Sequence, residues 1–110
     1  MQMDIAKIVT QLEELGIQER RSIRDDYNEL VLLNTPALLK TLTDIFGPAV
    51  KKPGEKPSNK MAELTRNYGG IWDNQALFKK DSQNGTIIAM FWPWNDEEHV
   101  TLKIAVIKSK

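Results

Sequence analysis

The stretch from residue 85 to residue 107, GTIIAMFWPWNDEEHVTLKIAVI, decides the fold class, because its pattern follows a period of two residues and not the helical period of 3.6. The alternation is cleanest at its end, where Val100, Leu102 and Ile104 share one side and Thr101 and Lys103 the other. A period of two residues is typical of β-strands. We therefore predict strands over residues 86–92 and 99–107, joined by a short loop into an antiparallel hairpin.

A further strand is predicted just upstream, over residues 71–80. The Asn84-Gly85 pair that follows is a strong turn signal, so the three strands are expected to form an antiparallel β-meander. In the middle strand, Ile87 and Ile88 point to opposite faces and both are apolar. Such two-sided apolarity is expected for a central strand that is covered on both faces.

The first 47 residues follow a helical period instead. A helix is predicted over residues 5–15, and another over 36–46, where Thr35-Pro36 provides the N-cap and Gly47-Pro48 the stop. Between them, Ile23, Tyr27 and Leu30 also recur at helical spacing, which predicts a further helix over 18–34. Residues 61–69 form a short fourth helix in this interpretation, because Ser58 is a possible cap and Gly69-Gly70 a stop.

The expected architecture is one α+β domain over residues 1–110. It consists of a part with three helices (1–47), a Pro/Lys-rich loop (48–60), the short fourth helix (61–69) and a three-stranded antiparallel β-meander (71–107). If the helices cover one face of the sheet, the second apolar face needs another cover. The candidates are the Pro/Lys-rich loop, a bound ligand or the same sheet in a second chain, so we expect a homodimer or a binding cleft.

Composition excludes several function classes. The chain has 15 basic and 15 acidic residues and no cysteine, so there is no general attraction to anionic partners and no disulfide, thiolate or Cys-ligated metal. With a single histidine, His99, a histidine-rich metal site cannot form. We predict no cofactor, no metal and no membrane partner. The N-terminal residues include Asp4, Lys7 and Glu13 and do not resemble a signal peptide, so a cytoplasmic location is expected.

The most unusual local feature is Trp92-Pro93-Trp94, which is followed by three acidic residues. Tryptophan offers a large contact area at a small entropic cost, and acids beside it suit a cationic ligand. We therefore expect a non-enzymatic domain that binds a protein partner or a small apolar ligand through an apolar face of the sheet and these tryptophans. The residues assigned to this site are Trp72, Met90, Trp92, Trp94 and His99.

Two alternatives belong to other function classes. Residues 48–80 hold 7 basic and 3 acidic residues, so Lys51, Lys52, Lys56, Lys60 and Arg66 could contact nucleic acid. We rank this alternative second, because the chain as a whole is neutral. The other alternative is an enzyme that uses His99 as acid or base, assisted by Glu97, Glu98 or Asp73.

Overall fold

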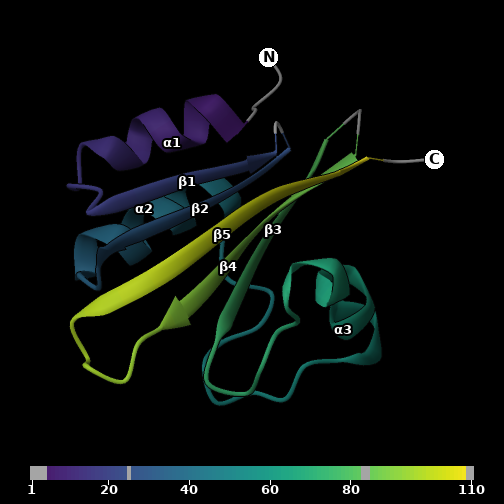
Figure 1. The fold of residues 1–110 in the computed structure, drawn as a ribbon. Coiled ribbons are helices and arrows are strands. Elements are labelled where there is room, and N and C mark those ends of the chain that lie inside the picture. Colours follow the sequence, from purple (N-terminus) through teal and green to yellow (C-terminus); the bar gives the residue numbers. More distant parts are fainter. Residues whose placement is uncertain (1–4, 25, 83–84, 109–110) are drawn as a thin grey trace.

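The computed structural model of the protein describes residues 5–24, 26–82 and 85–108 (Figure 1). In the described residues there are three α-helices, one 3₁₀ turn and five strands. In chain order the elements are α1 (Ile5–Glu13), β1 (Glu19–Arg24), β2 (Tyr27–Leu33), α2 (Pro36–Phe46), α3 (Asn59–Thr65), η1 (Arg66–Tyr68), β3 (Ala76–Ser82), β4 (Gly85–Pro93) and β5 (His99–Lys108).

All the strands belong to one antiparallel sheet of five strands in the order β1-β2-β5-β4-β3. The prediction of three N-terminal helices packed on a three-stranded meander is therefore wrong. In place of the helix predicted over 18–34, the structure has the antiparallel strands β1 and β2, and β2 pairs with β5 along its whole length.

The error has a physical cause. The apolar residues of the 18–34 segment fit a period of two as well as a period of 3.6, because Leu30 and Leu32 lie on one face and Tyr27 and Val31 on the other. Tyr27, Leu30 and Leu32 are buried and Val31 is half-buried. A strand that is covered on both faces loses the alternation that distinguishes it from a helix.

Helices α1 and α2 cover one face of the sheet and agree with the predicted helices. The Thr35 hydroxyl accepts a hydrogen bond from the Leu38 N–H at 3.3 Å, and Gly47 ends α2 with a φ of 83°. The main core forms between these helices and the sheet. It includes Ile8, Leu12, Leu38, Leu42, Leu30, Phe78, Phe91 and Leu102.

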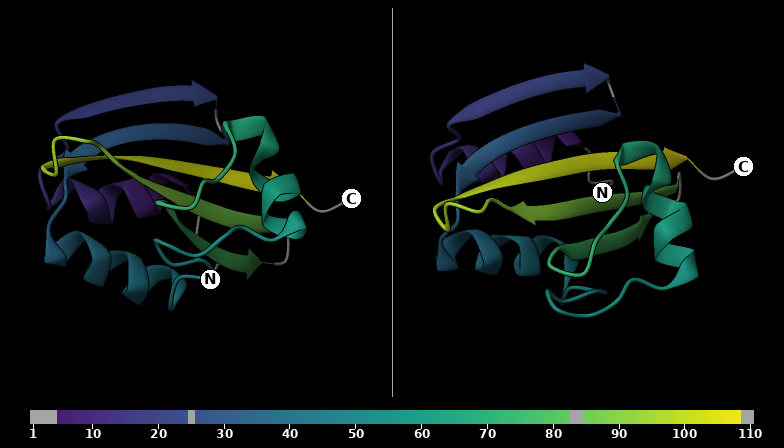
Figure 2. Two further views of the ribbon diagram at one scale, coloured as in Figure 1. Left: turned by 90° about the horizontal axis from the view of Figure 1, so that it is seen from below. Right: turned by 60° about the horizontal axis from the view of Figure 1, so that its bottom comes forward.

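The second face is covered in part by residues 48–75, which contain α3 and η1 (Figure 2). Met61, Leu64 and Tyr68 pack there against a smaller core of Ile71, Leu77, Ile88 and Met90. On the β3–β4 side, the second face of the sheet is thus covered by the chain itself. The need for a cover therefore no longer argues for a second chain on this part of the sheet.

The C-terminal strands lie close to their predicted ranges, except that β3 begins at Ala76 instead of residue 71. Residues 71–75 form a turn, in which the Gln75 N–H donates to the Trp72 carbonyl at 3.0 Å. The short helix begins at Asn59, after the cap Ser58, and continues as η1 to Tyr68.

Candidate binding site at the Trp94 corner

Trp94 lies just after β4 and is exposed but fixed in position. The residue keeps 43% of its surface accessible, while its Nε1–H donates to the Thr101 hydroxyl at 2.8 Å. The indole also packs on the His99 ring, with centroids 4.9 Å apart and an angle of 32° between the planes. An exposed aromatic ring held on both sides is preorganised for contact with another molecule.

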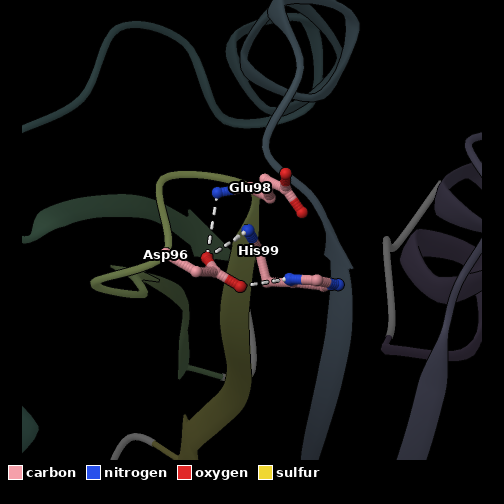
Figure 3. Close-up of side chains that lie close together, drawn as sticks. All are labelled: Asp96, Glu98 and His99. Carbon is pink, nitrogen blue, oxygen red and sulfur yellow. Dashed lines mark hydrogen bonds and ion pairs between the residues drawn. The ribbon is translucent and has the colours of Figure 1, made fainter.

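The turn from Trp94 to His99 is organised by Asp96 (Figure 3). Asp96 Oδ1 accepts hydrogen bonds from the backbone N–H groups of Glu98 at 2.9 Å and His99 at 3.0 Å. Asp96 Oδ2 lies 2.6 Å from His99 Nδ1. These hydrogen bonds lower the pKa of Asp96 from 3.8 to about 2, and the bond from the Glu98 N–H has the largest effect. Asp96 is therefore ionised at neutral pH and positions the imidazole on which Trp94 packs.

Glu97 occupies a strained position at the tip of the same turn. Its φ is +62°, and among the described residues it is the one non-glycine residue with a positive φ. A left-handed conformation costs a non-glycine residue about 1 kcal/mol, and such outliers concentrate at functional sites. The turn thus keeps an exposed carboxylate where glycine or asparagine would be less strained.

A metal ion is the other ligand that this turn could hold. Asp96, Glu98 and His99 each offer a ligand atom, and these atoms lie within 4.8 Å of one another. However, His99 Nδ1 is bonded to Asp96, and a metal would have to replace that bond. All three residues belong to one exposed turn, so we assign no metal to it.

The other residues predicted for the binding site have different positions. Met90 is fully buried in the second core and cannot reach a partner. Trp92 is half-buried and lies against Gly69, where an added Cβ would come within 2.9 Å of Trp92 Cη2. Trp92 and Trp94 share one end of β4, and Thr101 lies opposite Trp92 in β5. The structure therefore unites Trp92, Trp94 and His99 but excludes Met90.

Lys103 and its partners were not predicted. Lys103 Nζ lies 3.4 Å from the centroid of a Trp92 ring, donates to the Tyr68 carbonyl at 3.0 Å, and is 3.8 Å from Glu29 Oε2. The Tyr27 hydroxyl donates to the same Glu29 oxygen at 2.6 Å. Burial lowers the pKa of Lys103, and the nearby Glu29 carboxylate opposes this shift. The pairing of β2 with β5 brings Glu29 to Lys103, and the pairing of β4 with β5 brings Trp92 there. Both contacts depend on strand pairing, so no local sequence signal could have shown them.

Trp72 stands in the turn before β3 and has 61% of its surface exposed. The backbone N–H of Trp72 donates to Gln75 Oε1 at 2.9 Å. The turn leads into Ala76, the first residue of β3, which pairs with Phe91, the neighbour of Trp92 in β4. Trp72 thus belongs to the end of the sheet that carries Trp92.

Of the residues considered for nucleic-acid binding, Lys51 is inaccessible. It is 1% exposed, and its Nζ donates to the carbonyl oxygens of Lys52, Asp73 and Gln75. Burial lowers the pKa of Lys51, and the nearby carboxylates of Asp73 and Glu55 oppose this shift. Lys52, Lys56, Lys60 and Arg66 are exposed. The basic segment therefore keeps four surface cations, while Lys51 serves the fold.

The structure places Asp96 against His99, and not Glu97, Glu98 or Asp73 as the enzyme alternative assumed. Cavities of about 260, 170 and 310 Å³ occur elsewhere on the surface, and His99 lines none of these three. His99 therefore holds the Trp94 ring in place and does not line any of these cavities.

Comparison with known proteins gives no relative: no family model, no curated protein and no solved structure matches the chain. In the part of the chain that the structure describes, no helix has the length and apolarity needed to cross a membrane.

Proposed function

We propose that this protein is a non-enzymatic binding domain whose recognition element is Trp94 together with the acidic turn 95–98. The partner is a positively charged segment of another protein. The observation that carries this proposal is the exposed indole of Trp94, which is fixed by Thr101 on one side and His99 on the other.

The fixed indole supports binding in two ways. Little conformational entropy remains to be lost when a partner immobilises the ring. The ring face also attracts cations, and a Lys or Arg side chain within about 6 Å of its centroid gains about 0.5–1 kcal/mol at an exposed site.

The acidic residues of the turn divide into two roles. The carboxylate of Asp96 is engaged by its own turn and by His99. Glu97 and Glu98 are exposed, and no ion pair joins their carboxylates to the described residues. These two side chains are therefore placed to meet a cation beside Trp94, and they define a preference for basic partners.

The test is a binding assay on an array of synthetic peptides of about ten residues that vary in charge. The wild-type protein is expected to retain peptides rich in Arg or Lys, and Trp94→Ala is expected to lose them. Trp72→Ala is the matched control, because it removes an exposed tryptophan outside the acidic turn. Retention of the same peptides by Trp94→Ala, or no preference for basic peptides, would contradict the proposal.

A further inference from the structure

Strand β3 forms one edge of the sheet, and part of its backbone is unpaired. The N–H and C=O of Leu77 point away from β4, because they bond to residues 50 and 51. Along a strand this direction alternates, so the backbone groups of Lys79 and Asp81 also point outward. No hydrogen bond from the described part of the chain reaches these outward groups, and residues 79–81 are exposed.

The side chains of this edge make it complementary to itself. Lys79 and Asp81 lie on the same face of β3, 3.8 Å apart between Nζ and Oδ1. If two β3 strands pair antiparallel around a twofold axis at Lys80, Lys79 of each copy faces Asp81 of the other. Opposite charges in directly opposed positions stabilise a strand pair.

Other registers are less favourable. Hydrogen-bonded pairs between the two copies must join residues whose backbone groups point outward, and these are every second residue of β3. The twofold axis must therefore pass through a residue and not between two residues. An axis at Lys79 places two lysines opposite each other and requires Leu77, whose outward groups are already used. An axis at Asp81 places two aspartates opposite each other. Only the register centred on Lys80 joins opposite charges through outward-pointing backbone groups.

Lys80 itself lies on the axis but does not oppose this pairing. Its Nζ turns back to its own subunit and donates to the Ile45 carbonyl at 3.3 Å, near the C-terminal end of α2. A helix C-terminus stabilises a cation.

We propose that a second copy of this chain pairs with the β3 edge, antiparallel and centred on Lys80, so that the two sheets become continuous. This interface is separate from the Trp94 corner. It is small, consisting of the backbone pairs between Lys79 and Asp81 of the two copies and the contacts around them. The homodimer is therefore expected to be weak and reversible.

Sedimentation of the purified protein from about 1 µM to about 1 mM tests the proposal. The wild type is expected to shift reversibly from 12.6 kDa to twice that mass. In the variant Lys79→Asp, an acidic side chain lies opposite Asp81 of the other copy. The repulsion between these like charges is expected to weaken the dimer at least about tenfold. The double variant Lys79→Asp/Asp81→Lys exchanges the charges and is expected to restore it. Lys40→Asp, the same charge reversal on α2, is the control and leaves the dimer unchanged.

A further variant tests the backbone pairing. Lys79→Pro removes an N–H that points away from β4, so the pairing of β3 with β4 remains and the dimer is lost. A wild type that stays monomeric over the whole range overturns the proposal. A dimer that survives both Lys79→Asp and Lys79→Pro, or a double variant that stays monomeric with an unchanged circular dichroism spectrum, overturns it equally.

Discussion

At the scale of single residues, Asp96 shows how one carboxylate organises a site. It accepts two backbone hydrogen bonds, pairs with His99, and through His99 supports the Trp94 ring. The neighbours Glu97 and Glu98 have the same charge, but they lack these bonds. Sequence alone identified the turn and its acids, yet it could not rank them, because the ranking depends on which carboxylate folds back onto the backbone.

The pH dependence of stability follows from the pKa of Asp96. This pKa is about 2 in the folded protein against an ordinary value of 3.8, so the folded state favours the ionised form. The resulting stabilisation is complete above pH 3.8 and is lost as the pH falls towards about 2. We expect the thermal midpoint of the wild type to exceed that of Asp96→Asn at neutral pH, and the gap to close over this acid range.

Thermal unfolding followed by circular dichroism at a series of pH values measures this gap. Asp44→Asn, which changes an exposed carboxylate on α2, serves as the comparison and should show no such closing gap. A gap between wild type and Asp96→Asn that stays constant down to about pH 2 would show that the Asp96 charge does not stabilise the turn.

At the scale of elements, local signals determined which predictions held. The caps of α2 and α3 and the alternation of β5 are encoded within a few residues. Helix α2 and strand β5 lie where they were predicted, while α3 begins at Asn59 instead of residue 61. The 18–34 segment was misread because its strand is buried on both faces, and burial depends on the α3 side of the fold as well as on α1. The partners of Trp94 and Trp92, Thr101 and Lys103, depend on strand register, which no local pattern specifies.

The junction of η1 with the following turn gives a prediction at this scale. Gly69 has a φ of +99°, and a Cβ there would lie 2.9 Å from Trp92 Cη2 and 3.0 Å from Lys103 Nζ. Gly70 has a φ of +79° but open space around it. Gly70→Ala is expected to lower the free energy of unfolding by about 1 kcal/mol through backbone strain. Gly69→Ala is expected to lower it by about 2 kcal/mol or more, since the rigid indole must also move.

Urea unfolding of the two variants separates these effects, because they share the backbone penalty and differ in the contact. Tryptophan fluorescence of the folded Gly69→Ala protein should also change, since Trp92 is displaced. Equal losses of stability in the two variants would mean that Gly69 does not set the packing of Trp92.

At the scale of the whole molecule, the two covers of the sheet differ in strength. On one face α1 and α2 bury a continuous core against the strands β2, β5, β4 and β3. On the other face the cover contains the seven-residue helix α3, in which Thr65 alone is buried. Lys51 ties this cover to the sheet, because its backbone pairs with Leu77 and its Nζ binds three carbonyls. The molecule therefore has a stable body and a cover that depends on one buried cation.

This arrangement predicts that residues 48–75 open before the sheet unfolds. Native-state hydrogen exchange should show amides of α3 exchanging at least about tenfold faster than those in the centre of β4 and β5, which have neighbours on both sides. Lys51→Met removes the three hydrogen bonds that Nζ donates to the carbonyls of Lys52, Asp73 and Gln75, and it should accelerate exchange in the cover further. Lys52→Met, at an exposed lysine, should not. Uniform acceleration of β4 and α3 in Lys51→Met would instead mean that the cover and the sheet unfold as one unit, because a separate cover can lose its anchor without loosening the central strands.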